Sequence, residues 1–138
     1  MLSTATVEAD AETAAALGLE IAALVLEVVR VRLADGEPIS LERARFPAER
    51  FPDLLDRALA GSLYELLDTH YGLVPGEAEE RIEVVAAGAA EARLLGLPRG
   101  APLLAVARIA WDADGRPFEH SHDLFRADRA RILVRTAG

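Results

Sequence analysis

The chain has 138 residues, of which 51% are hydrophobic, and a formal charge of −8 at pH 7. This length and composition predict a single globular domain over residues 1–138, with one hydrophobic core. The acidic balance argues against direct binding to a phosphate backbone, which requires a basic surface. The chain has no cysteine, which excludes disulfides and thiolate chemistry. It also has no apolar run of bilayer length and no basic start, so we expect a cytoplasmic protein without membrane contact.

The beginning of the chain predicts a loose start followed by a short helix. Residues 1–7 show no pattern that we assign to an element. The stretch Glu8–Leu17 is rich in alanine, which favours a helix, and Gly18 is a typical residue just beyond a helix C-terminus.

A hairpin is predicted next, with strands over Ile21–Leu33 and Glu37–Phe46 joined by an Asp-Gly turn. Because strand side chains alternate, Arg30 and Arg32 point to the same face, opposite the neighbouring valines. Two adjacent guanidinium groups repel each other unless negative charge lies between them. Either Glu42, on the returning strand, or a bound anion can supply that charge.

The remaining elements follow from capping and turn signals. Two prolines predict an irregular connection between residues 47 and 59, and the S-x-x-E pattern at Ser62 predicts a helix over Leu63–Tyr71. The later elements are expected to be a strand at Glu79–Ala87, a helix at Ala89–Leu95, a strand pair at Pro102–Ala113 and Arg116–Phe125, and a last short strand at Ile132–Arg135.

A helix-hairpin unit occurs twice in the sequence. Arg30 matches Arg108 at a spacing of 78 positions, as Gly18 matches Gly96, and the two D-G-x-P turns match at a spacing of 79. This repeat predicts an α+β fold, with an antiparallel sheet of about six strands, a pseudo-twofold axis and helices packed on one side. A cleft is expected where the two halves meet.

The strongest candidate site is an anion site. The first amide groups of the helix after Ser62 are unpaired and its dipole favours negative charge, which Arg30 and Arg32 also attract. Alternatively, Ser62 only caps the helix. Glu42 and Glu119 could accept hydrogen bonds from the other end of a ligand, or could be partners of arginine or solvated. Tyr64 and Phe125 could form walls of the site, or belong to the core.

Other chemistries find little support. His120 and His122 share a strand face, as metal ligands would, but no third ligand has the usual spacing and Asp123 has the wrong parity, so we expect no metal site. No nucleophile motif or phosphate-binding glycine loop is present, and we expect neither catalysis nor a cofactor.

Several segments taken together resemble one family. These are RVRLADGEPISLE, GSLYELL, LLGLP, DGRPFEHS and RADR, in this order between Glu8 and Arg131. They resemble the UTRA domain, the effector-binding domain of HutC-type regulators in the GntR superfamily, which is similar in fold to chorismate lyase. In relatives that bind phosphosugars, the residues matching Arg30, Arg32, Ser62, Leu63 and Tyr64 hold the phosphate.

The resemblance also assigns ligand contacts to Glu42, Glu119 and Ser121, and to a tyrosine that this chain replaces with Phe125. It implies a homodimer that senses a small anionic metabolite, such as a phosphosugar, a phosphonate or an organic acid. DNA contact would come only through an N-terminal winged helix-turn-helix domain, which is not in these 138 residues. The alternatives are a chorismate-lyase-like enzyme acting on an anionic substrate and a purely structural dimerisation module.

Overall fold

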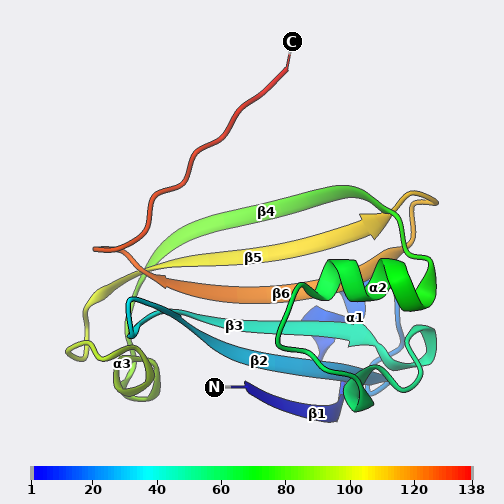
Figure 1. The fold of residues 1–138 in the computed structure, drawn as a ribbon, viewed down its shortest axis with the longest axis horizontal. Helices are drawn as coiled ribbons and strands as arrows, with labels where there is room; N and C mark the ends of the chain where they lie inside the picture. The colour runs from blue at the N-terminus through cyan, green and yellow to red at the C-terminus, as the bar shows by residue number, and fades with distance from the viewer. Residues whose placement is uncertain (1, 138) are drawn as a thin grey trace.

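A computed structural model describes residues 2–137 and shows one antiparallel sheet of six strands, in the order β1-β2-β3-β6-β5-β4 (Figure 1). The strands are β1 (Leu2–Glu8), β2 (Leu24–Ala34), β3 (Glu37–Pro47), β4 (Pro75–Ala86), β5 (Pro102–Asp112) and β6 (Pro117–Arg126). The helices are α1 (Ala11–Leu17), α2 (Leu63–Tyr71) and α3 (Ala89–Leu95), and two 3-10 turns, η1 (Ala48–Arg50) and η2 (Leu54–Asp56), precede α2. The predicted α+β class and antiparallel sheet are confirmed. None of the helices in the described part of the chain is long and apolar enough to cross a membrane.

The sheet is built from two copies of one unit. The first copy is β1-α1-β2-β3 and the second is β4-α3-β5-β6, and they join through the central pair of β3 and β6. Strand β2 begins at Leu24 and β5 at Pro102, the spacing of 78 positions that the sequence repeat shows. The repeat is therefore confirmed, and each copy is longer by one strand than predicted.

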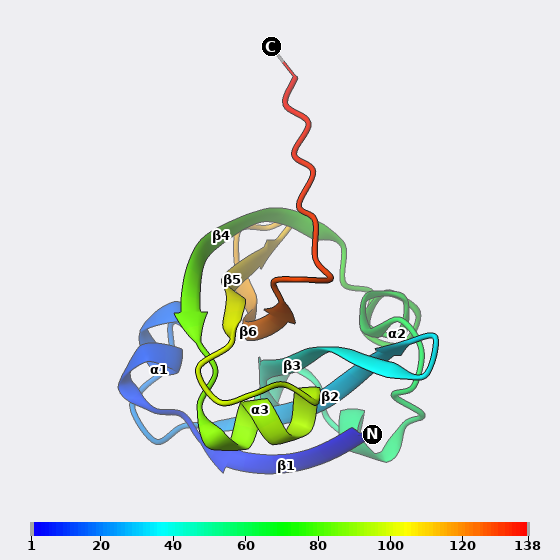
Figure 2. The same cartoon turned by 90° about the vertical axis from the view of Figure 1, so that its left-hand side faces the viewer.

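The prediction that all helices pack on one side of the sheet is wrong for α2. Neighbouring residues of β2 point to opposite faces: Val25 packs with the buried side chains of α1, and Leu26 packs with those of α2. Figure 1 shows α2 in front of the sheet and α1 behind it, and Figure 2 shows the same helices on opposite sides. Helix α3 packs with Val31, on the α1 face. The physical reason is that the first half of β2 is apolar on both faces, so both need a cover.

Two further predictions at the ends of the chain are wrong. The start is not loose, because Leu2–Glu8 pairs with β2 as an edge strand. The short strand expected at Ile132–Arg135 is not formed, and after β6 the chain runs away from the sheet (Figures 1 and 2). Helix α1 begins at Ala11, because Asp10 caps it by accepting a hydrogen bond from the Thr13 amide at 2.8 Å.

Candidate functional site

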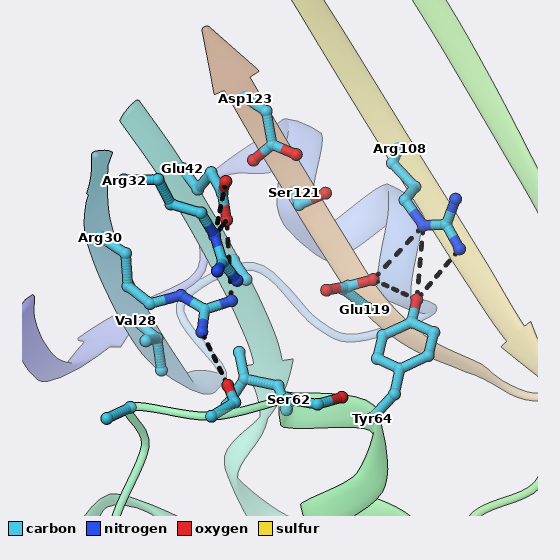
Figure 3. Close-up of a pocket in the computed structure, with 14 residues that line it drawn as sticks. Val28, Arg30, Arg32, Glu42, Ser62, Tyr64, Arg108, Glu119, Ser121 and Asp123 are labelled. Carbon is cyan, nitrogen blue, oxygen red and sulfur yellow. Dashed lines mark hydrogen bonds and ion pairs between the residues drawn. The ribbon is translucent and has the colours of Figure 1, made fainter. Parts of the chain in front are cut away.

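A cavity of about 500 Å³ lies on the α2 face of the sheet, where the two halves meet the start of α2 (Figure 3). Its floor comes from β2, β3, β6 and β5, whose side chains of one parity point into it. Its wall comes from the loop before α2 and from the first turn of that helix. The lining residues are Val28, Arg30, Arg32, Glu42, Ala44, Ala60, Gly61, Ser62, Leu63, Tyr64, Arg108, Glu119, Ser121 and Asp123.

One side of the cavity carries the arginines of β2. Arg32 Nε lies 2.9 and 3.0 Å from the two carboxylate oxygens of Glu42, the residue directly opposite Arg30 on β3. Arg30 Nη2 lies 3.6 Å from Glu42, while its Nη1 donates a hydrogen bond to the Gly61 carbonyl at 3.1 Å. Arg30 thus ties the strand to the loop that leads into α2.

The other side carries a second charged cluster, centred on Tyr64. The Tyr64 hydroxyl donates to Glu119 at 2.6 Å and accepts from the Arg108 guanidinium at 3.1 and 3.3 Å (Figure 3). Arg108 also lies 3.5 Å from Glu119 and 2.6 Å from Glu80. Burial raises the pKa of Glu119 and of Tyr64, so the Tyr64 hydroxyl keeps its proton at neutral pH.

Between these two clusters lies Asp123, on β6 directly opposite Glu42. Burial, together with the charges of Glu42 and Glu119, raises the pKa of Asp123 to about 7. The carboxyl is therefore partly protonated at neutral pH, and in that form it can donate a hydrogen bond.

The start of α2 brings backbone donors to the same cavity. Ser62 Oγ accepts a hydrogen bond from the Glu65 amide at 3.3 Å, the cap that the sequence predicts. The side chain of Leu63 is buried in the core, so at the cavity this residue offers chiefly its backbone. The helix dipole at this end favours negative charge.

The lining holds three arginines and three carboxyl groups, with hydroxyl and amide groups beside them. Such a site can pair an anion with guanidinium and amide donors at one end. At the other end the site can accept hydrogen bonds from hydroxyl or amino groups of the ligand, or donate hydrogen bonds to them.

The structure brings eight of the nine predicted site residues to this cavity: Arg30, Arg32, Glu42, Ser62, Leu63, Tyr64, Glu119 and Ser121. The ninth, Phe125, lies further along β6, opposite Ser40, and is outside the lining among the described residues. We did not predict Arg108 and Asp123. The repeat pointed to Arg108 through its match with Arg30, and the parity of Asp123 with Glu119 and Ser121 pointed to the carboxyl.

His120 and His122 point to the opposite face of the sheet, toward α1. His120 Nδ1 lies 3.0 Å from Thr13 Oγ1, and His122 Nε2 lies 3.2 Å from Glu12 Oε1. Burial and the neighbouring His122 lower the pKa of His120, so this ring is neutral at pH 7.

The fold and the polar cavity define a ligand-binding domain without a motif for catalysis. A family model described as the UTRA domain matches residues 1–131, and the chain belongs to this family. The UTRA domain is the ligand-binding regulatory domain of GntR-family transcriptional regulators, which are not enzymes.

Named relatives agree with this assignment. The chain is 30% identical over 123 residues to the HTH-type transcriptional repressor NagR of Bacillus subtilis. The aligned region covers 89% of the chain and 51% of NagR. The chain is 32% identical over 122 residues to the repressor PhnF of Mycolicibacterium smegmatis, covering 88% of the chain and 50% of PhnF. The crystal structure of PhnF from Mycobacterium smegmatis superposes with a TM-score of 0.94 at 30% identity, covering 100% of this chain and 62% of that one. The chain thus spans about half the length of the curated relatives it matches.

Proposed function

We propose that this domain binds a small anionic metabolite in the cavity at the start of α2 and thereby controls DNA binding by a transcriptional repressor. The observation that carries the proposal is the meeting of Arg30, Arg32 and Arg108 with the first turn of α2 around a cavity of about 500 Å³. This volume is within the range of small-molecule sites.

In this proposal the anionic end of the ligand lies between Arg30 and the first amide groups of α2. Those amide groups and the guanidinium are donors, which a phosphate, phosphonate or carboxylate satisfies. Glu119, Ser121 and the Asp123 carboxyl then face the other end of the ligand and bind its hydroxyl or amino groups. A phosphosugar, a phosphonate or an organic acid fits this pattern.

The regulatory step is linkage between binding sites. The domain forms a homodimer in the cytoplasm, and in a longer protein of this family an N-terminal winged helix-turn-helix domain contacts DNA. The ligand shifts DNA affinity only to the extent that it binds one arrangement of the dimer more tightly than the other.

A structural dimerisation module is the second candidate, because Glu42 already neutralises Arg32 at 2.9 Å. The open cavity beside that ion pair favours ligand binding.

A thermal-shift screen of the purified chain tests the proposal. The panel contains inorganic phosphate, hexose 6-phosphates, alkylphosphonates and small dicarboxylic acids. A ligand that binds only the folded state raises the melting temperature in proportion to the logarithm of its concentration. We expect at least one class to do so at concentrations where sodium chloride of equal ionic strength has no effect. A panel without any specific shift would favour the dimerisation module.

A further inference from the structure

We propose that Glu12, His120 and His122 form a binding site for a zinc-type divalent metal ion, on the face of the sheet opposite the effector cavity. The two histidines come from alternate positions of β6, and the glutamate comes from α1, 110 positions before His122. The local spacing of the sequence does not predict this third ligand, because only the fold brings Glu12 to the histidines.

The donor atoms are already close together. Glu12 Oε1 lies 3.2 Å from His122 Nε2 and 3.7 Å from His120 Nε2, and one ligand atom from each residue lies within 4.8 Å of the others. Zinc binds imidazole nitrogen and carboxylate oxygen at about 2.0–2.2 Å in a tetrahedron, which places neighbouring ligand atoms about 3.3 Å apart. The Glu12–His122 separation already matches this spacing, whereas the Glu12–His120 separation is longer and has to shorten. The His122 side chain is 40% exposed, which leaves space for it to adjust.

Contacts behind the ligands hold the inner imidazole in place. Thr13 Oγ1 lies 3.0 Å from His120 Nδ1, and it accepts a hydrogen bond from Arg45 Nη1 at 3.0 Å. The contact occupies Nδ1, so the other ring nitrogen faces Glu12. Metal-bound histidines typically have such a partner on the second nitrogen, which fixes the ring orientation.

The site is open on one side. Glu12 and His120 line a cavity of about 350 Å³, which leaves room for a water molecule as fourth ligand. The rest of the lining comes from two alanines of α1, from β5, and from Glu79 and Arg81 of β4. Two imidazoles and one carboxylate suit zinc and its neighbours among the transition metals, whereas magnesium and calcium prefer oxygen ligands alone. The competing explanation is that Glu12 merely accepts a hydrogen bond from His122 and lies near His120.

Isothermal titration calorimetry of the chelator-dialysed chain with zinc chloride distinguishes these explanations. We expect one zinc ion per chain, no saturable heat with magnesium chloride, and at least tenfold weaker zinc binding in Glu12→Gln and in His122→Ala. Both side chains are exposed, so these variants should keep the fold, which far-UV circular dichroism checks. His70→Ala, which changes the remaining histidine, and Glu79→Gln, beside the cluster, should bind zinc as the unchanged chain does.

Cobalt chloride supplies a second readout, because tetrahedral cobalt(II) absorbs strongly in the visible range. We expect this band with the unchanged chain and its loss in Glu12→Gln. The inference would be overturned if zinc bound without saturation at one ion per chain, or if Glu12→Gln bound it as tightly as the unchanged chain. It would also be overturned if Asp123→Asn, on the opposite face, abolished binding. Loss of zinc binding in Asp123→Asn would place the ion in the effector cavity, whereas the other two results would not bear on that cavity.

Discussion

Arg30 connects the strand floor of the cavity to the loop before α2 by a side-chain hydrogen bond. It is only 15% exposed, and its hydrogen bond to the Gly61 carbonyl places its positive charge beside the helix start. We expect Arg30→Ala to weaken binding of the ligand found in the thermal-shift screen at least tenfold, about 1.4 kcal/mol, measured by calorimetry. The loss of stability should be about 0.5–1.5 kcal/mol, the contribution of a typical hydrogen bond.

Arg43→Ala is the matched control for Arg30→Ala. Arg43 lies on β3 but points to the α1 face, where its Nε is 3.8 Å from Glu27. Arg43→Ala removes the same charge from the same sheet without changing the cavity. This variant should therefore leave ligand affinity unchanged. Equal affinities of Arg30→Ala and the unchanged chain would show that Arg30 is not part of the site.

The raised pKa of Asp123 makes a second prediction, about pH. Burial and the nearby carboxylates raise this pKa to about 7 in the folded chain, against a usual value of 3.8. The folded state thus holds the proton more tightly than the unfolded state. The contribution of the Asp123 carboxyl to the free energy of unfolding is fully present below pH 4. It is lost as the pH rises through about 7.

Asp123→Asn removes this titration. Between pH 5.5 and pH 8.5 we expect the unchanged chain to lose at least about 1.4 kcal/mol more of its free energy of unfolding than Asp123→Asn does, as measured by urea denaturation. The surface variant Thr69→Ala, on α2, should follow the unchanged chain. Identical pH profiles for Asp123→Asn and the unchanged chain would place the Asp123 carboxyl in water.

Sequence patterns could predict most of the cavity because its residues obey strand parity and helix capping. Arg30, Arg32 and Glu42 follow from a hairpin whose turn fixes the register. The distance of Phe125 from the cavity could not be predicted, because parity gives the face of a residue and not its position along a twisted strand. The contact between Tyr64 and Arg108 joins residues 44 positions apart, and only the fold shows it.

At the scale of elements, Gly76 allows β4 to start against β5. A Cβ atom at Gly76 would clash with the backbone carbonyl oxygen of Asp112 and lie 2.9 Å from its carbon. Because both groups are backbone, Gly76→Ala must push the strands apart where their register already shifts, between Pro75 and Ala78. We expect a loss of about 1–3 kcal/mol in the free energy of unfolding, measured with urea.

Gly61→Ala provides the control for the Gly76 variant. A Cβ atom there would meet no heavy atom within 4 Å, so the variant should be as stable as the unchanged chain or slightly more stable. Equal stability of the two alanine variants would contradict the close approach of β4 and β5.

Helices were easier to predict than the arrangement of the strands, for a local reason. The bounds of α2 and α3 agree with the prediction because Gly72 and Gly96 end them in left-handed conformations, with φ of 63° and 65°. Strand β1 was missed because it is an edge strand whose pairing with β2 depends on contacts distant in sequence. The face that α2 covers depends on the path of the whole connection after β3.

For the molecule as a whole, the doubled unit places the cavity beside the central pair of strands. Arg30 and Arg108 occupy matching positions of the two halves, and both reach the lining. Helix α2 belongs to neither copy of the unit and covers one half, which makes the site asymmetric. The repeat thus provides paired charges, and the insertion provides the helix start that distinguishes one end of a ligand from the other.

The same face of the sheet carries an apolar patch, formed by the exposed Ile82 and Val84 of β4 and the half-buried Leu104 of β5 and Phe125 of β6. Leu104 lies directly opposite Val84 and Phe125 in the strand register, and Val84 is 69% exposed. Pairing of two copies through the free edges of β4 is disfavoured, because this strand carries four glutamates and one arginine. We therefore expect two copies of the chain to pair through the apolar patch.

Val84→Arg tests this arrangement by placing a charge in the middle of the patch. We expect the dimer dissociation constant, measured by sedimentation equilibrium, to rise at least tenfold, because an unpaired charge in an apolar interface is costly. Val74→Arg is the matched control, since Val74 is 57% exposed but precedes the other end of β4.

If the patch and the cavity are linked, a saturating ligand must change the dimer dissociation constant. The factor must equal the factor by which dimerisation changes ligand affinity. A monomeric unchanged chain, or a dimer that Val84→Arg leaves intact, would show that the two copies do not meet at this face.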